Sequence, residues 1–382
     1  MLIGIDGNEA NEVRADIGER VGANVYAYEL FREIYRLRKI GKINHDFVLY
    51  LKNPPAFDLP KENSWWKYKI IPGSGLWIIR KLMPTLLLKK KPDVFFSPNH
   101  YLPPITLMPK VCTIHDLGYL KFSGQFKKHD FWQLKYWTAI SITISKYIIA
   151  VSKNTADDIV RHYPFASKKH IVVHHGYDKK RFNNNISYDV VRRVKKRYLI
   201  KGKYILFLGT LKPNKNIEGI IDAFNIICDY HKDNSIKLVI SGKKGWLYNS
   251  IFNKVRHLKL GKKVIFTDFV DEKDKPALLF GAHLLISPSF WEGFGLHILE
   301  SLACGTPVVA SKVASIPEVV GKAAIYVNPI KPESISEGII KVLSMNKLEY
   351  NKLVKMGIIQ AGKFSWEKCA RKTIGILEKA VK

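Results

Sequence analysis

One stretch, residues 282–310, constrains the fold of this chain more than any other. The mainly apolar run 282–286 predicts a buried strand, and the glycine-containing segment 287–295 predicts a loop. Residues 296–304 then predict a helix that Gly305 ends from the C′ position. Strand, glycine loop and helix in this order form an anion site, because a helix N-terminus leaves backbone N–H groups unpaired. The stretch therefore predicts an α/β fold with a phosphate-binding loop.

Two glutamates of this stretch, Glu292 and Glu300, are candidates for chemistry. Glu292 stands in the predicted loop, and Glu300 stands about one turn inside the predicted helix, near the anion site but too far along to compete for its free N–H groups. One acid can then contact a sugar and the other a ribose. Taken alone, the same pair also fits a solvated helix face above a core that includes Phe290 and Phe294.

The length, charge and cysteine content of the chain limit the number of domains and the kinds of partner that we expect. A chain of 382 residues exceeds one ordinary core, so we expect two domains. The 62 Lys and Arg against 33 Asp and Glu give a net charge of +29, which attracts nucleic acid, anionic membrane or anionic small molecules. Four widely spaced cysteines predict neither a zinc site nor a disulfide framework. The start reads as a short strand rather than a signal sequence, and no apolar run has the length of a membrane span, so we expect a cytoplasmic protein.

Strands alternating with helices along the chain predict doubly wound parallel sheets. The segment 6–23 carries three glycines and predicts a mobile loop, and Gly22 stands where this loop meets a helix N-terminus. A later strand, 111–117, ends in His115-Asp116, at the edge where open α/β sheets bind ligands. His115 is therefore a second candidate, although a lone histidine is more often structural. We also expect Asn154 to cap the helix after residue 152.

In the second half, the strand 204–208 leads through Gly209 and Thr210 to a turn and a helix. Lys215 stands near that helix start, where an ammonium neutralises a diphosphate. An exposed lysine at the start of a helix is the alternative reading of Lys215.

Several motifs occur together and in order. Glu292-x7-Glu300 begins with Glu-Gly-Phe-Gly-Leu and is followed by Cys304-Gly-Thr-Pro-Val-Val-Ala and Pro317-Glu-Val-Val-Gly321. This series resembles the family 4 retaining glycosyltransferases. The resemblance implies the GT-B arrangement, in which two Rossmann-like doubly wound domains face a cleft that holds a nucleotide-sugar. We expect an N-terminal acceptor-side domain at 1–183, a C-terminal nucleotide-sugar domain at 184–364, and a helix at 365–382 that packs back on the first domain.

The resemblance also implies roles for residues. Glu292 would hold sugar hydroxyls, His115 would face the donor sugar, and Glu300 would hold the nucleotide ribose. The expected donor-binding residues are Gly22, Gly209, Thr210, Lys215, Val270, Phe294, Gly295, Leu296 and Glu300. Two positions depart from the family pattern: Asn24 replaces the second glycine of the first loop, and Asn214 replaces an arginine beside Lys215, so either Lys212 substitutes or the phosphates are held less tightly.

Two segments of the first half mix aromatic and basic residues. Residues 76–91 fit a membrane-surface helix with Trp77, Ile78 and Leu82 dipping into lipid, and they fit equally a helix that packs on the sheet and ends in solvated lysines. Residues 121–137 fit an acceptor or membrane face, with base stacking as the rival interpretation.

These patterns favour an enzyme that moves a hexose from a nucleoside-diphosphate sugar, GDP-mannose or a UDP-sugar, to a glycan or lipid-linked acceptor. The segments 5–11 and 209–216 look like those of mannosyl- and related transferases of surface-polysaccharide assembly.

No Asp-x-Asp pair occurs, so we expect no metal and no cofactor. We also expect a peripheral position at the inner face of an anionic membrane. The alternatives are a sugar-nucleotide epimerase of the same layout and a non-catalytic basic membrane- or nucleic-acid-binding protein. Since none of the standard nucleic-acid motifs occurs, we expect no specific nucleic-acid partner.

Overall fold

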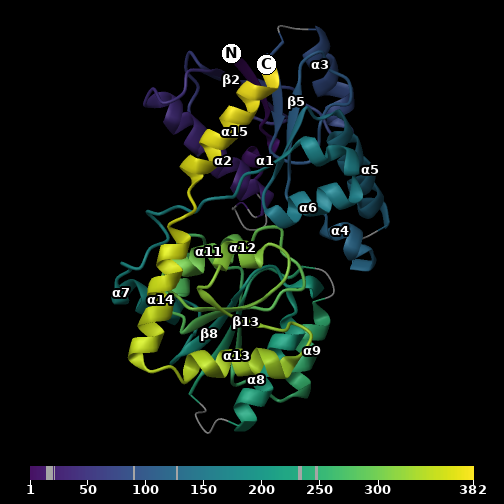
Figure 1. Ribbon diagram of the computed structural model, residues 1–382. Helices are drawn as coiled ribbons and strands as arrows, with labels where there is room; N and C mark the ends of the chain where they lie inside the picture. Colours follow the sequence, from purple (N-terminus) through teal and green to yellow (C-terminus); the bar gives the residue numbers. More distant parts are fainter. Residues whose placement is uncertain (14–19, 21, 89–90, 126–127, 231–234, 246–247) are drawn as a thin grey trace. The chain divides into compact units, whose positions relative to one another are not determined.

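The computed structural model describes residues 1–13, 20, 22–88, 91–125, 128–230, 235–245 and 248–382. The chain forms two α/β units (Figure 1). Unit 1 contains Met1–Gly176 and Ser365–Lys382, and unit 2 contains Tyr177–Phe364. The chain thus passes between the units slightly before the boundary expected after residue 183.

Unit 1 is built on a parallel sheet of seven strands in the order β3-β2-β1-β4-β5-β6-β7. Its strands are β1 (Leu2–Asp6), β2 (Asp46–Leu51), β3 (Trp66–Ile70), β4 (Val94–Ser97), β5 (Lys110–Ile114), β6 (Tyr147–Ala150) and β7 (His170–Val172). The strand order reverses direction between β1 and β4, which pair through Ile3 with Val94 and Ile5 with Phe96. β4 and β5 are buried along their whole length, as expected for central strands of a parallel sheet covered on both faces.

Helices cover both faces of this sheet (Figure 1). They are α1 (Asn8–Asn11), α2 (Ala23–Lys39), η1 (Ile78–Leu82), α3 (Met83–Leu88), α4 (Gly118–Lys121), η2 (Ser123–Gln125), α5 (Lys128–Ile144), α6 (Lys153–His162), η3 (Pro164–Lys168) and α15 (Trp366–Val381). α2 and α15 contact each other on one face, and residues of α3, α5 and α6 form a core cluster with the opposite face.

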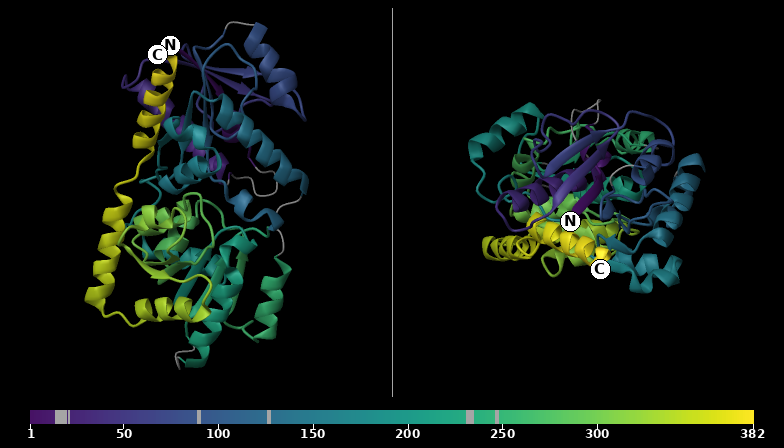
Figure 2. Two further views of the ribbon diagram at one scale, coloured as in Figure 1. Left: turned by 45° about the vertical axis from the view of Figure 1, so that its right-hand side comes forward. Right: turned by 90° about the horizontal axis from the view of Figure 1, so that it is seen from above.

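The C-terminal helix α15 belongs to unit 1, and the two chain ends lie near each other in that unit (Figure 2). Arg36 of α2 pairs with Glu367 at 2.8 Å, and His45 contacts Glu378 at 2.8 Å. The chain leaves unit 1 at Gly176 and returns at Ser365, and these two points touch: a Cβ added to Gly176 would lie 2.0 Å from the Trp366 nitrogen. Only glycine fits this close approach of two backbones.

Unit 2 is built on a parallel sheet of six strands in the order β10-β9-β8-β11-β12-β13. Its strands are β8 (Tyr204–Leu208), β9 (Lys237–Ser241), β10 (Val264–Asp268), β11 (Leu284–Ser287), β12 (Val308–Ser311) and β13 (Ala324–Val327). The strand order reverses between β8 and β11, where Ile205 pairs with Leu284. Both units therefore have the doubly wound topology that the alternating strands and helices predict.

The helices of unit 2 lie on both faces of its sheet. They are α7 (Tyr188–Arg197), η4 (Pro213–Lys215), α8 (Ile217–Tyr230), α9 (Asn249–His257), α10 (Lys275–Phe280), α11 (Leu296–Ala303), α12 (Ile316–Val320), α13 (Pro332–Leu343) and α14 (Lys347–Ala361). Residues of α8, α9 and α13 form one core cluster with the sheet, while α11 packs against α10, α12 and α14.

Two local expectations differ from the structure. Within the segment expected as a mobile loop, Asn8–Asn11 is a helical turn, and residues 14–19 and 21 lie outside the described residues. The N-cap of α6 is Ser152, whose hydroxyl accepts from the Thr155 N–H at 3.0 Å, and not Asn154.

The membrane-surface reading of residues 76–91 is wrong for Trp77 and Leu82. Trp77 is 1% exposed, donates from its indole nitrogen to the Ile71 carbonyl at 2.7 Å and lies in the core cluster, as does Leu82. This part of the segment packs on the sheet, while Leu88 is exposed and Lys89 and Lys90 lie outside the described residues.

Candidate active site

Most of the predicted site residues lie in two loops of unit 2. One loop, residues 209–216, follows β8, and the other, residues 288–295, follows β11. β8 and β11 are the neighbouring strands at which the sheet order reverses, and ligands of open α/β sheets bind at the carboxyl ends of strands at such a point. The topology thus brings the Lys215 loop and the Glu292 loop to the same edge.

Serine hydroxyls hold the Glu292 loop in place. Ser289 donates to Glu292 Oε1 at 2.9 Å, and Ser315 donates to the Glu292 backbone carbonyl at 2.8 Å. Ser311, at the end of β12, donates to the Ser289 carbonyl at 2.6 Å. Glu292 is only 8% exposed, so its carboxylate has a fixed position inside the protein rather than a solvated one.

Lys215 ends the short helix η4 and forms an ion pair with Glu292 through Nζ and Oε1. Both side chains are nearly buried, at 11% and 9% exposure. Burial alone would raise the pKa of Glu292, but the charge of Lys215, with hydrogen bonds from Lys215 and Ser289, lowers it to about 2. Glu292 is therefore a carboxylate at neutral pH, and Lys215 is not a solvated helix-start lysine.

Two asparagines fasten the Lys215 loop to its neighbours. Asn214 accepts a backbone hydrogen bond from Phe290 at 2.8 Å, and its side chain donates to the Trp291 carbonyl at 3.3 Å. Asn216 has a positive φ of 55° and donates to the carbonyls of Pro288 at 3.2 Å and Pro329 at 2.6 Å. At the position where the resemblance expects an arginine, this chain has a residue that joins the two loops.

Gly295 starts the helix α11 in a left-handed conformation, with φ of 91°. Its carbonyl already accepts from the Leu299 N–H at 3.2 Å, so Leu296 is the first helical residue and its N–H lies at the free helix end. The preceding Phe294 is buried and contacts Phe364 edge to face at 5.9 Å between centroids. The predicted anion-binding end of a helix thus follows Glu292 directly.

His297, in the first turn of α11, was not predicted as a site residue. Its Nε2 lies 3.1 Å from the Ser287 hydroxyl. Burial lowers the pKa of His297 to about 4, although the Glu292 carboxylate opposes this shift. At neutral pH the imidazole is uncharged, and His297 adds a polar group beside the Glu292 carboxylate.

Glu300 lies one turn further along α11 and is 5% exposed. Its Oε2 lies 2.8 Å from Nζ of Lys275, the first residue of α10. Burial raises the pKa of Glu300, and Lys275 is the main group that opposes this shift. Lys275 was not predicted, because it is 25 positions away in a charged segment without a motif.

The other predicted donor-binding residues of unit 2 follow two different strands. Gly209 and Thr210 directly follow β8, and the Gly209 N–H donates to the Ser241 carbonyl at 2.9 Å. Close packing explains the glycine that follows β9: a Cβ on Gly242 would lie 1.9 Å from the Gly209 carbonyl oxygen. Val270 is buried after β10, two strands away from β8 in the sheet. Thr210 is exposed, whereas Val270 is not.

His115 and Gly22 belong to unit 1. His115 directly follows β5, and its Nε2 lies 3.0 Å from the Pro98 carbonyl, which can only accept, so this nitrogen donates. Burial lowers the pKa of His115, and the imidazole is neutral at pH 7. Gly22 is the N-cap of α2 with φ of 57°, and the Asn24 side chain donates to the Glu9 carbonyl at 3.0 Å. Asn24 thus has a structural contact that the glycine it replaces could not make.

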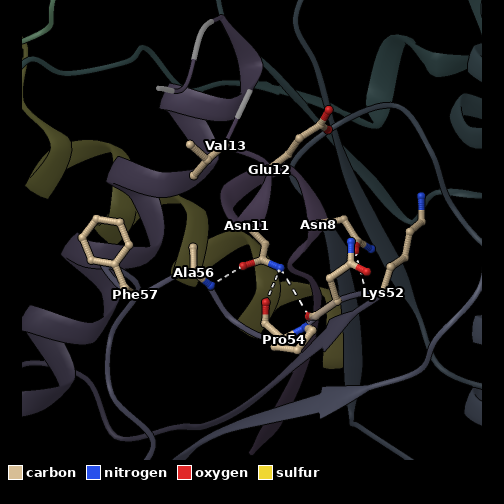
Figure 3. Close-up of a pocket in the computed structure, with 9 residues that line it drawn as sticks. Asn8, Asn11, Glu12, Val13, Lys52, Pro54, Ala56 and Phe57 are labelled. Carbon is tan, nitrogen blue, oxygen red and sulfur yellow. Dashed lines mark hydrogen bonds between the residues drawn. The ribbon is translucent and has the colours of Figure 1, made fainter. Parts of the chain in front are cut away.

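Unit 1 also has a cavity of about 610 Å³ at the carboxyl ends of β1 and β2 (Figure 3). Its lining residues are Asn8, Asn11, Glu12, Val13, Lys52, Asn53, Pro54, Ala56 and Phe57. Asn11 bonds to the backbone of the opposite loop, accepting from Ala56 at 2.6 Å and donating to Pro54 at 3.0 Å. The Phe57 ring is fully open to solvent, at 99% exposure.

The described part of the chain shows neither a metal-binding cluster nor a membrane-spanning helix. No group of three or more His, Cys, Asp or Glu side chains within it is placed to hold a metal ion. None of its helices combines the length and the apolar character that crossing a membrane requires.

Two family models match the chain, one in each half. The model of Glycosyltransferase Family 4 matches residues 22–181, and the model of glycosyl transferases group 1 matches residues 192–358. The chain belongs to the family 4 glycosyltransferases. The resemblance inferred from the Glu292-x7-Glu300 series is therefore confirmed at the level of the family.

This glycosyltransferase is similar to named relatives. It is 29% identical to the O-antigen chain mannosyltransferase B of Escherichia coli over 284 residues, which are 74% of each chain. It is 25% identical to the mannosylfructose-phosphate synthase of Agrobacterium fabrum, over 95% of its own length and 87% of the relative's.

Solved structures share the fold. The Anabaena protein HepE, in complex with UDP and glucose, matches with a TM-score of 0.76 and 16% identity over 99% of both chains. WaaG, a glycosyltransferase involved in lipopolysaccharide biosynthesis, matches with a TM-score of 0.72 and 14% identity over 99% of both chains. The expected α/β architecture of two Rossmann-like units, the GT-B type, is confirmed.

Proposed function

We propose that this glycosyltransferase transfers a hexose, with mannose favoured, from a nucleoside-diphosphate sugar to a glycan or lipid-linked acceptor, with retention at the anomeric carbon. One observation carries the proposal. Two buried carboxylates, each paired with a lysine, flank the free N-terminus of α11 at the β8/β11 edge of unit 2. Positive groups for a diphosphate and fixed acceptors for hydroxyl groups are thus present in one site.

The roles that we propose for the site residues follow from where charge develops during glycosyl transfer. Glycosyl transfer passes through an oxocarbenium-like state, so positive charge grows on the sugar and negative charge on the departing diphosphate. Lys215 and the backbone N–H groups at the start of α11 would stabilise the leaving group. Glu292 would hold the sugar hydroxyls, and Glu300 the ribose. A bound diphosphate would compete with Glu292 for the Lys215 ammonium, which couples donor binding to the position of the catalytic carboxylate.

We also propose that the reaction needs no metal ion and no cofactor. The support is the charge already present, since the Lys215 ammonium and the N-terminus of α11 can offset a diphosphate. Transfer that persists in excess chelator supports this part of the proposal, and transfer that stops until Mg²⁺ or Mn²⁺ is added contradicts it.

The preference for mannose rests on the relatives. Mannosyltransferases of O-antigen chains in Escherichia coli and Salmonella typhimurium are among the proteins to which this chain is similar. GDP-mannose is accordingly the first donor to test, and a UDP-sugar is the second.

Unit 1 would supply the acceptor side. Its cavity offers a carboxylate, an ammonium and one face of an aromatic ring, in Glu12, Lys52 and Phe57 (Figure 3). Carboxylates bind sugar hydroxyls, and an exposed ring covers the apolar face of a sugar. His115, at the carboxyl end of β5, would face the donor sugar as an uncharged imidazole.

A lipid-linked acceptor would bring the protein to the inner face of an anionic membrane. The support is an exposed stripe on α5, where Trp132, Tyr136 and Ile140 lie one turn apart and are 45%, 60% and 40% exposed. Trp132 and Tyr136 stack at 5.4 Å, and the Lys135 ammonium lies 4.8 Å from the Trp132 ring. With a net charge of +29, this face combines the apolar and the basic groups that an anionic lipid surface attracts.

The test is a transfer assay with GDP-mannose or UDP-glucose and lipid-linked oligosaccharides as acceptors. We expect release of one nucleoside diphosphate that depends on acceptor, and a product with the anomeric configuration of the donor. Conversion of the donor sugar to an isomer without acceptor would instead indicate an epimerase. Steeply salt-dependent oligonucleotide binding without nucleotide-sugar turnover would indicate a basic binding protein.

A further inference from the structure

Four charged side chains of alternating sign form a continuous row in unit 2 that ends at Glu300. Arg181 contacts Glu272 through Nη2, at 2.8 Å to Oε2 and 2.6 Å to the backbone carbonyl. Lys275 lies between two carboxylates, 3.5 Å from Glu272 Oε1 and 2.8 Å from Glu300 Oε2. The ammonium of Lys275 is therefore held from both sides, and Arg181 fixes the acid on its far side.

Because Glu300 is buried, it needs the neighbouring charges of this row to remain ionised. The Glu300 side chain is 6% exposed and the Lys275 side chain is 17% exposed. A buried carboxylate without a partner protonates rather than remaining an ion. Burial would lower the pKa of Lys275, but Glu300 and Glu272 together raise it, so the lysine remains charged and can keep Glu300 ionised.

The geometry leaves part of the carboxylate available. The ion pair engages Oε2, so Oε1 lies outside it. Glu300 is the fifth residue of α11, and helical side chains lean toward the helix N-terminus, which here is the free end after Gly295. A ligand with its phosphates at that end would present its ribose near Glu300 Oε1.

We infer that Lys275 is a positioning residue for the nucleotide ribose: it holds the Glu300 carboxylate as an ion in one orientation, with Oε1 free to accept from ribose hydroxyls. This inference rests on the proposed function, because it concerns the nucleotide of the same donor. Lys275 does not itself contact the donor in this arrangement, and it acts through Glu300.

The test compares ribose and deoxyribose nucleotides. Dissociation constants of GDP or UDP, whichever the wild type binds, and of the 2′-deoxy and 3′-deoxy forms are measured by calorimetry. The wild type is expected to prefer the ribose form by about tenfold or more, since hydrogen bonds to a charged group are strong. Lys275→Met should remove most of that preference by weakening the ribose form, while the deoxy forms change little.

Lys273, two residues before Lys275, provides a matched control. Lys273 contacts Asp271 at 3.6 Å and is 72% exposed, so Lys273→Met removes an equal charge without touching Glu300. Lys273→Met should keep the full ribose preference of the wild type. Lys275→Arg, which keeps the positive charge, should keep part of it. If Lys275→Met does not fold, Lys275→Gln, which keeps a polar end without the charge, takes its place.

A pH series gives a second readout. The charged groups that face Glu300 are Lys275, Glu272 and Arg181, and the Cys304 thiol lies nearby. In Lys275→Met the buried Glu300 should bind ribose nucleotides better as the pH rises, because the carboxyl regains its charge, whereas the wild type should depend less on pH.

The outcomes separate this inference from the function on which it rests. An unchanged ratio of ribose to deoxyribose affinity in Lys275→Met, with a lower melting temperature alone, would show that Lys275 only stabilises the fold. If the wild type bound no nucleoside diphosphate, the proposed function would fail and the role of Lys275 with it.

Discussion

Lys215 and Glu292 form a nearly buried ion pair that joins the loop after β8 to the loop after β11. The two residues are far apart in the sequence, and the strand order of unit 2 makes their loops neighbours. A buried pair of this kind is weak evidence for a stabilising purpose, because desolvation offsets much of the attraction. Its position at the ligand-binding edge of a doubly wound sheet favours a functional reason for it.

Lys215→Met should destabilise the protein in a pH-dependent manner. The folded pKa of Glu292, about 2, lies below its ordinary value of 4.5, so Lys215 contributes stability above pH 4.5 that is lost as the pH falls toward 2. At pH 7 the difference from wild type should be about 3 kcal/mol. Urea unfolding at several pH values measures it, with Lys273→Met as the control. A difference that stayed constant down to pH 3 would contradict the role of this ion pair.

Replacing the two glutamates should affect different kinetic constants. Glu292→Gln should lower kcat on the order of a hundredfold or more with a smaller effect on donor KM, because its contacts strengthen in the transition state. Glu300→Gln should raise donor KM about tenfold and largely keep kcat, because ribose contacts act in both states. The exposed Glu337 of α13 provides the control Glu337→Gln. An intact kcat in Glu292→Gln would remove that residue from the catalytic role.

Gly176→Ala should destabilise unit 1. The added Cβ would lie 2.0 Å from the Trp366 nitrogen, and backbone on both sides leaves no flexible side chain to yield. We expect a loss of about 2 kcal/mol or more. Gly375→Ala in α15 is the matched control, since nothing lies within 4 Å of its added Cβ, and it should stabilise the helix by about 0.5–1 kcal/mol. Equal melting temperatures for the two variants would contradict the close approach.

The α5 stripe should determine binding to anionic lipid. Trp132→Ala with Tyr136→Ala should weaken binding to phosphatidylglycerol vesicles about tenfold or more in a sedimentation assay, because two exposed aromatic rings are lost. Tyr188, 77% exposed in unit 2, gives the control Tyr188→Ser. Binding that survives the double substitution, or that the control weakens equally, would show that the basic charge alone attracts the protein.

The sequence predicted the sheets and the main loops because their signals are local. Apolar runs such as 204–208 give strands, and Gly295 and Gly305 limit the helix between them. The sequence left Trp77 open between a membrane helix and a helix packed on a sheet, because aromatic and basic residues in alternation look the same on both, and its burial selects the packed helix.

No local sequence pattern predicts contacts between residues that are far apart in the chain. The sequence predicted Glu300 but not Lys275, because only the packing of α10 against α11 brings the two together. It predicted Lys215 as an ammonium near a helix start that neutralises a diphosphate, but not the pairing of Lys215 with Glu292. The roles of Glu292, Glu300, Lys215 and His115 in catalysis remain predictions.

The most direct test of the proposed function is thermal denaturation with GDP, UDP, ADP and TDP in turn, with ATP as an anion control. A ligand at about 100 times its dissociation constant adds roughly 2.7 kcal/mol to the folded state, which a melting curve resolves. We predict that one diphosphate, most readily GDP, raises the melting temperature of the wild type and that Lys215→Met abolishes the increase. Equal increases with every nucleotide, or none, would contradict a nucleotide-sugar site in unit 2.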